Sequence, residues 1–298
     1  MIETVERAAN ILKKMGAESY DVYAVSSEGT TVEAKDGKVE KIRLSAPRGM
    51  AIRVLIDGRL GFSYTNDVSE DGIRIAIECA KENALSSEPD DYLFSIPEEV
   101  ELSFSLEDGD FFHISTERKI ELALELEERA RSYSPKIKRV RKASYSDSRT
   151  TVYYYNSNGH SFSYTTTSYS LSTLVAAEED DSSQMGWDYQ GKRYFSELNP
   201  IEVAVGAASS AVELLGAKPM KTLRLPVIFK NSVFAQLIEA LSGAFLGITS
   251  GEKSRSLQTD STPKLRATRS TSTMTPTKRT DLEVLPMTMR ELSRKRPQ

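Results

Sequence analysis

The sequence predicts an α+β fold in which helices pack on mixed or antiparallel sheets. Three observations support this class. Apolar residues recur at helical spacing in several segments, strand-like segments are joined in pairs by Asp-Gly turns, and no unit of about 20–50 residues repeats. Hairpins that alternate with amphipathic helices are typical of a sheet with helices packed on it.

The first elements are a helix and two hairpins. Residues 2–15 place Ile2, Val5 and Leu12 on one helical face, and Gly16 ends the helix. Asp36-Gly37 and Asp57-Gly58 are strong hairpin turns. The expected strands are residues 20–25, 31–33, 39–44, 50–56 and 60–64.

A helix over residues 69–84 follows, with Ser69 as its N-cap. The chain's one cysteine, Cys79, lies in this helix. A single cysteine excludes an internal disulfide and a CxxC zinc site. From its place in this helix, we expect Cys79 to be a small core residue rather than a reactive thiol.

The second half begins with another helix, which is followed by strands of a meander. A helix over residues 116–133 starts at Ser115 or Thr116, and Asn158-Gly159 marks a later turn. The acidic run 178–181 favours a solvated loop over a cation site, since it lacks regular ligand spacing. The expected strands are residues 138–146, 150–156, 161–169 and 171–177. They are followed by a helix over 200–215 that Gly216 ends, a buried strand over 223–229 and a helix over 231–246.

Composition excludes several classes of protein. The 298 residues are 39% apolar, which suffices for a packed core and gives room for about two domains. No apolar run approaches the roughly 18 residues of a membrane span, and no signal segment is apparent, so we expect a cytoplasmic protein that does not enter membranes. The net charge of −4 argues against a chain that binds nucleic acid along its whole length.

Charge is unevenly distributed. Residues 251–298 carry 11 Lys/Arg and 5 Asp/Glu, a net of +6, which leaves −10 on the first 250 residues. This tail has no aromatic residue and is rich in Ser and Thr, so we expect it to be disordered. It is either a basic arm for nucleic acid or a segment that is not native coding sequence.

No catalytic motif is apparent from residue chemistry. The segment from Gly247 to Ser254 resembles a phosphate loop, but it has the wrong glycine spacing, and Glu252 precedes Lys253. The two histidines, His113 and His160, form no HExxH-type pair, and no serine lies in GxSxG. On these grounds the chain alone is not expected to be an enzyme.

Four segments, in order, resemble the TldD/PmbA family, the "modulator of DNA gyrase" proteins. They are Gly49-Met-Ala-Ile-Arg-Val-Leu-Ile-Asp-Gly58, Gly61-Phe-Ser-Tyr-Thr-Asn-Asp67, the stretch from Ala207 to Gly216-Ala-Lys218, and Leu225-Pro-Val-Ile-Phe229 running into the next helix. The resemblance covers roughly residues 1–258 and implies the family's fold, with residues 1–216 as the N-terminal α+β domain and residues 222–258 as the start of a truncated β-rich C-terminal domain.

The resemblance also implies a branch of the family. TldD-like members carry HExxxH on the helix after the Pro-Val-Ile strand, where two histidines hold a catalytic zinc. Here the histidine positions are Ile238 and Gly243, and only Glu239 remains. Isoleucine and glycine side chains donate no lone pair, so the resemblance places the chain in the PmbA/TldE branch. It implies no catalytic residue, metal or cofactor in this chain, and a zinc ion in a TldD-like partner.

For function, the resemblance implies a subunit of a cytoplasmic TldD–TldE protease. Such a complex acts on unfolded peptides, in proteolysis, peptide maturation and antitoxin degradation, and the metal-free subunit would help to bind an extended peptide. The partners expected are a TldD-like subunit or a second copy. The alternative is a regulator that binds DNA gyrase or DNA through the basic tail, which the net of −10 elsewhere weakens. A stand-alone hydrolase is disfavoured by the missing zinc ligands.

The resemblance stops near Gln258. Read one nucleotide earlier, the codons of residues 273–276 and 281–292 permit Y-D-D-P, G-L-G-S-x-P and Y-D-D-E-G-V, in the order in which the family carries such motifs. We therefore hypothesise that residues 259–298 are a frameshifted translation. A stop codon in the shifted frame before the second motif would disprove this.

Overall fold

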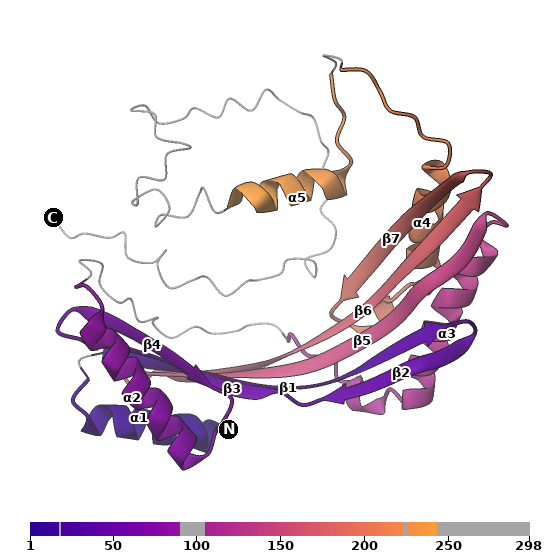
Figure 1. Cartoon of the computed structure of the whole chain (residues 1–298). Coiled ribbons are helices and arrows are strands. Elements are labelled where there is room, and N and C mark those ends of the chain that lie inside the picture. The colour runs from indigo at the N-terminus through magenta and orange to yellow at the C-terminus, as the bar shows by residue number, and fades with distance from the viewer. Residues whose placement is uncertain (18, 90–104, 223–225, 243–298) are drawn as a thin grey trace. The chain divides into compact units, whose positions relative to one another are not determined.

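The computed structural model describes residues 1–17, 19–89, 105–222 and 226–242 (Figure 1). The chain divides into two compact units, the first ending at Ala217 and the second beginning at Lys218. Gly243, the end of the helix expected over 231–246, the phosphate-loop-like segment and the tail 259–298 lie outside the described residues.

The first unit contains a seven-stranded antiparallel sheet. Its helices are α1 (Ile2–Lys14), α2 (Glu70–Ser86), α3 (Thr116–Ser132) and α4 (Pro200–Glu213), with short 3₁₀ turns η1 (Phe111–His113) and η2 (Phe195–Glu197). Its strands are β1 (Ser19–Lys35), β2 (Lys38–Ser45), β3 (Arg48–Ile56), β4 (Arg59–Thr65), β5 (Ile137–Asn156), β6 (Ser161–Glu179) and β7 (Ser182–Lys192). The α+β prediction is confirmed.

The strand order is β4-β3-β1-β5-β6-β7, and β2 also pairs with β1. Strand β1 is long enough to serve two partners along one edge: β3 pairs with its first half and β2 with its second. Along its other edge β1 pairs with β5 in an unbroken register from Asp21 to Ala34.

Four of the helices cover one face of this sheet. Val22 and Ala24 of β1 lie in a core with α1 and α2, whereas Val32 and Ala34 lie in a second core with α3 and α4. These β1 residues have the same parity in an unbroken strand, so both cores lie on the same face. Figure 1 shows the α1–α2 pair at one end of the sheet and the α3–α4 pair at the other. We call the other face, which these helices leave uncovered, the open face.

Several expected strands are continuous. Residues 20–25 and 31–33 belong to the single strand β1, residues 138–146 and 150–156 to β5, and residues 161–169 and 171–177 to β6. The residues between the expected strands continue the ladder with the neighbouring strands. The acidic run 178–181 is split, since Glu178 and Glu179 end β6 and Asp180 has a positive φ in the turn to β7.

Three further expectations are corrected. Strand β7 was not predicted. The strand expected over 223–229 is wrong for residues 226–229, which are irregular and exposed because no described strand pairs with them. Cys79 is exposed rather than in the core. The buried stripe of α2 centres on Ile73, Ala80 and Ala84, and Cys79 points about 120° away from it.

The turns and caps were predicted correctly. Asp36-Gly37 and Asp57-Gly58 adopt positive φ angles at both residues, as tight hairpin turns require. The Ser69 side chain accepts a hydrogen bond from the Gly72 N–H, and Ser115 caps α3 in the same way. Two glycines allow helices to approach strands closely: a Cβ at Gly61 would lie 1.9 Å from the Ala80 carbonyl oxygen of α2, and one at Gly186 2.0 Å from that of Ala207 on α4.

Candidate functional site

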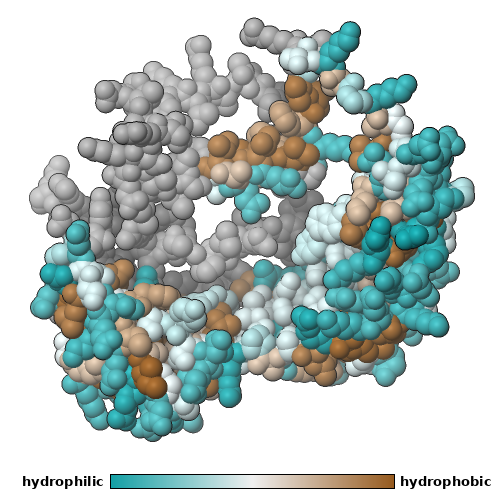
Figure 2. Space-filling view, viewed as in Figure 1, coloured by the Kyte–Doolittle hydropathy of each residue, from teal (hydrophilic) through white to brown (hydrophobic). Residues whose placement is uncertain are grey.

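The helix expected to correspond to the zinc helix is α5 (Asn231–Ser242), in the second unit. It carries Ile238 and Glu239, both exposed, while Gly243 lies outside the described residues. Its apolar side is also exposed, with brown side chains along the helix in Figure 2; these are Val233, Phe234, Leu237, Ile238 and Leu241. The described part of the chain contains no cluster of three His, Cys, Asp or Glu side chains suited to a metal. That this chain binds no zinc stays a prediction.

The two histidines lie apart, on η1 and in the turn after β5, and both are exposed. The structure therefore does not bring them together as a catalytic or metal-binding pair. The larger candidate site is the open face, which the sequence did not single out. Directly opposed residues of antiparallel strands share a face, so the strand registers identify its members.

One end of the open face is aromatic. Tyr23 of β1 opposes Tyr154 of β5, which opposes Phe162 of β6. The rings of Tyr154 and Phe162 stack with centroids 4.9 Å apart, and Tyr164 continues the stack at 6.4 Å. Burial, followed by the neighbouring Tyr164 hydroxyl, raises the pKa of Tyr23 to about 12. Phe62 and Tyr64 of the edge strand β4 extend this cluster.

A buried carboxylate lies beneath these rings. Arg53 of β3 donates from Nε to Asp21 at 3.0 Å and also forms an ion pair with it, and the Tyr154 hydroxyl donates to the same carboxylate at 3.3 Å. Asp21 is almost fully buried, so these partners offset the cost of burying its carboxylate. This arrangement fixes the aromatic end of the face.

The middle of the open face is lined by small hydroxyl side chains. Serines alternate along β5 and β6 opposite one another: Ser144 with Ser172, Ser146 with Ser170 and Ser148 with Ser168. Hydroxyl–hydroxyl hydrogen bonds link strands, between Ser27 and Thr150 at 2.8 Å and between Thr31 and Ser146 at 3.0 Å. Because these side chains are short, another polypeptide can approach the sheet closely here.

The far end combines charge and aromatic rings. Lys142 of β5 donates to Glu33 of β1 at 2.8 Å, and this hydrogen bond lowers the pKa of Glu33, with Lys41 and Arg43 of β2 adding to the effect. Met185, Trp187 and Tyr189 project from β7 on the same face and are exposed. The Trp187 and Tyr189 rings stack at 6.1 Å.

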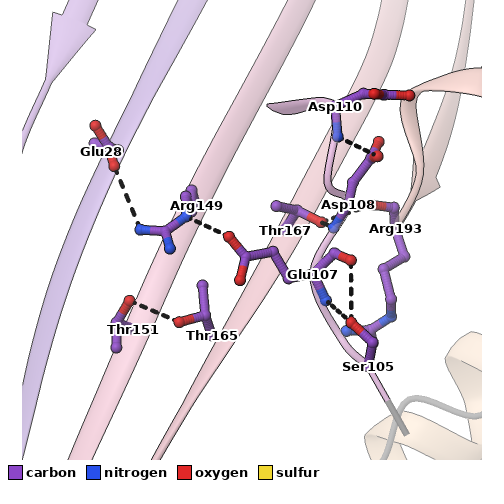
Figure 3. A network of polar contacts seen from close by, with 10 residues as sticks. All are labelled: Glu28, Ser105, Glu107, Asp108, Asp110, Arg149, Thr151, Thr165, Thr167 and Arg193. Atoms are coloured by element: carbon purple, nitrogen blue, oxygen red, sulfur yellow. Dashed lines mark hydrogen bonds and ion pairs between the residues drawn. The ribbon is translucent and has the colours of Figure 1, made fainter. Parts of the chain in front are cut away.

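The covered face holds the polar contacts that fix the sheet. Figure 3 shows Arg149 of β5 between Glu107, which its Nε contacts at 2.7 Å, and Glu28 at 3.6 Å. Asp108 accepts from the backbone N–H of Asp110, and its own N–H donates to Thr167 (Figure 3). Asp108 also accepts from the backbone N–H of Phe195. These contacts attach the segment around Glu107 and Asp108 to β5 and β6. Their role is structural, because they hold this segment against the sheet.

Sequence patterns match two domains of one peptidase family. Residues 20–84 match the PmbA/TldA metallopeptidase domain 1, and residues 109–215 match the PmbA/TldA metallopeptidase central domain. The chain belongs to the PmbA/TldD family. The resemblance carried by the glycine-rich hairpin of β3 and β4 and by the end of α4 is thereby confirmed.

Curated relatives within the PmbA/TldD family are similar over most of this chain. A metalloprotease PmbA homolog of Haemophilus influenzae is 29% identical over 249 residues, covering 82% of this chain and 55% of the relative. The metalloprotease PmbA of Escherichia coli O157:H7 is 29% identical over 239 residues, covering 79% of this chain and 52% of that protein. The chain spans about half the length of the curated relatives it matches.

Solved structures show the same fold. A protein from Thermotoga maritima described as a modulator of a DNA gyrase has a TM-score of 0.67 at 22% identity, over 80% of this chain and 54% of that one. TldE from Thermococcus kodakarensis has a TM-score of 0.60 at 15% identity, over 70% and 47% of the two chains. None of the described helices is both long and apolar enough to cross a membrane.

Proposed function

We propose that this chain is the metal-free, PmbA/TldE-like subunit of a TldD–TldE-type peptidase of the cytoplasm, which acts on unfolded peptides. The observation that carries the proposal is the composition of α5. Where a TldD-like helix would present its first zinc-binding histidine, this helix presents Ile238, which cannot bind a metal, beside the exposed carboxylate of Glu239.

The open face supports the peptide-binding part of the proposal. It offers aromatic surface at both ends and a floor of small hydroxyl side chains between them. Such a surface suits an extended chain, whose backbone approaches the floor while its side chains contact the rings. In this proposal the TldD-like partner supplies the zinc and the activated water, and this subunit supplies binding surface.

The test is reconstitution with a TldD-like subunit that carries HExxxH. We expect the pair to co-purify, zinc to be bound only when that subunit is present, and peptide cleavage only by the pair. Glu239→Gln in this chain should leave the rate unchanged, whereas Glu→Gln in the partner's motif should abolish cleavage. Stoichiometric zinc in the isolated chain together with chelator-sensitive cleavage would overturn the proposal. Salt-sensitive DNA binding that disappears with residues 259–298 would instead favour the regulatory alternative.

A further inference from the structure

Strand β2 is an exposed edge of the sheet. All eight of its residues are exposed, and within the described parts of the chain it pairs only with β1. The outer edge of such a strand presents backbone N–H and C=O groups that another extended chain can pair with.

The edge is held in place at both ends. At the hairpin tip, the Gly37 N–H donates to the buried Glu127 of α3 at 3.0 Å, and Arg131 of α3 reaches Asp36 at 3.5 Å while also pairing with Glu127. At the other end, the Ser27 N–H donates to the Pro47 carbonyl at 2.9 Å. The strand is therefore presented in extended form before any partner arrives, which lowers the entropic cost of pairing.

The two sides of β2 differ in chemistry. Lys41 opposes Glu33 and Arg43 opposes Thr31, so both cations lie on the open face. Ile42 and Leu44 oppose Val32 and Thr30, so they lie on the covered side, where Leu44 is 76% exposed. A chain paired with β2 would meet basic groups on one face and apolar groups on the other.

The basic row has excess positive charge. The carboxylate of Glu33 faces Lys142, Lys41 and Arg43, and its lowered pKa reflects all three. Lys142 is the one that pairs with it directly, at 2.8 Å. Within the described segments, neither Lys41 nor Arg43 lies within ion-pair distance of a carboxylate. The row is therefore complementary to acidic side chains.

The apolar row borders a hollow. Leu44 lines it together with Phe111, Phe112 and Ile114 from the segment before α3, and its volume is about 420 Å³. The side chains on this side of a chain paired with β2 point toward the hollow. It is large enough for a bulky apolar side chain next to Leu44.

A second copy of this chain is a poor partner for β2. If two copies of β2 paired antiparallel with Ile42 at the centre, Lys41 of each copy would lie opposite Arg43 of the other. If the pairing were centred on Lys41 or on Arg43, that residue would lie opposite its own copy. Like charges directly opposite one another destabilise a strand pair, so β2 disfavours its own sequence.

We propose that β2 pairs with an extended peptide segment in which acidic side chains alternate with apolar ones. The acidic side chains contact Lys41 and Arg43 on the open face, and the apolar ones contact Ile42, Leu44 and the hollow. The inference rests on the proposed function only in taking the ligand to be an unfolded peptide.

The test uses the full chain and fluorescent eight-residue peptides, with binding followed by anisotropy. A peptide alternating Glu and Val should bind about tenfold more tightly than one alternating Lys and Val, the ratio that about 1.4 kcal/mol gives. The double variant Lys41→Glu/Arg43→Glu should reverse this preference. The matched variant Lys13→Glu/Lys81→Glu makes the same charge change on α1 and α2 and should preserve it. N-methylation of alternate peptide bonds in the Glu/Val peptide should abolish binding.

Other outcomes overturn the inference. Equal binding of the two peptides would mean that β2 does not select peptides by the charge of their side chains. Undiminished binding of the N-methylated peptide would mean that the peptide does not pair with β2 as a strand. A dimer of this chain that the peptide fails to dissociate and that Lys41→Glu strengthens, because it places a carboxylate opposite Arg43, would identify a second copy as the occupant. The binding assay needs no zinc, no cleavage and no partner subunit. A negative result in it therefore leaves the reconstitution result unaffected, and a negative reconstitution result leaves the binding result unaffected.

Discussion

Asp147 shows how a single buried charge is kept in this sheet. Its carboxylate accepts hydrogen bonds from the Thr30 N–H and the Tyr145 hydroxyl, both at 2.8 Å, and pairs with Lys119 of α3 at 2.6 Å. Lys119 also lies 5.6 Å from the ring centre of Phe111. These contacts attach α3 to two strands, so the pair is a structural link rather than a catalytic one.

Breaking this pair should be costly. Lys119→Met leaves a buried carboxylate without its cation, and we expect a loss of about 3–5 kcal/mol in the free energy of unfolding, measured by urea denaturation. The double variant Lys119→Met/Asp147→Leu should recover much of the loss because neither charge of this pair stays buried. Arg118→Met breaks an exposed pair with Glu121 and should cost less than about 1 kcal/mol. Equal losses in the two single variants would contradict this reasoning.

The tyrosines predict a response to alkaline pH. Burial raises the pKa of Tyr20, Tyr23, Tyr145, Tyr154 and Tyr169 above the ordinary 10.0. A raised pKa in the folded state means that the unfolded chain releases the proton first. The associated stability is therefore complete below pH 10 and, for Tyr23, is lost as the pH rises from 10 to about 12.

We expect the urea midpoint to fall as the pH is raised above 10, and to fall less steeply in Tyr23→Phe. Tyrosinate absorbance, followed in the same samples, should show part of the tyrosines ionising only on unfolding. Tyr64→Phe, at a position that is 73% exposed, is the control and should keep the wild-type slope. An unchanged slope in Tyr23→Phe would show that this hydroxyl carries no part of the effect.

At the level of elements, helix packing depends on two glycines. An alanine at Gly61 would overlap the Ala80 carbonyl of α2, and one at Gly186 would overlap the Ala207 carbonyl of α4. Each substitution should lower stability by about 1–3 kcal/mol, since the helix must shift away from the strand. Gly109→Ala is the control because nothing lies within 4 Å of its Cβ position. Thermal melts compare the three, and an unshifted Gly61→Ala would refute the close approach.

The close packing of α4 on β7 explains why β7 was not predicted from the sequence. Its covered side carries Gly186 and Asp188 beneath α4, and its apolar residues Met185, Trp187 and Tyr189 are on the open face. In a strand next to a core, apolar residues are expected on the side that the helix covers, but in β7 they lie on the opposite side. The helices and hairpin turns were predictable because caps, Asp-Gly pairs and apolar spacing are local signals.

The candidate site was only partly predictable. That Ile238 and Glu239 occupy degenerate zinc-helix positions stays a prediction, and the structure places both exposed on α5. The open face was missed, although serines at every second position of β5 and β6 are a signal for one strand face. Which face helices cover is set by contacts between segments far apart in sequence, so it could not be inferred locally.

At the level of the whole first unit, two cores share one sheet. One core lies under α1 and α2 and the other under α3 and α4, and both include β1. Because β1 and β5 pair along almost their full lengths, loss of one core removes support from the other.

We therefore expect the first unit to unfold in a single transition. Ile77→Ala in one core and Leu126→Ala in the other should each lower stability by about 2–5 kcal/mol. In each variant, the unfolding transition followed by Trp187 fluorescence should coincide with the one followed by far-ultraviolet circular dichroism, although Trp187 lies on β7 at the α4 end of the sheet. Separate transitions for the two probes would mean that the cores are independent.

The length of β1 also restricts how this protein can change over evolution. From Ser19 to Lys35 the strand supports both cores with side chains of the same parity. One residue inserted near its midpoint would turn Val32 and Ala34 toward solvent and bring Thr31 and Glu33 inward. Viable descendants should therefore gain or lose residues here two at a time, or add a compensating bulge, and single-codon indels should be confined to the turns.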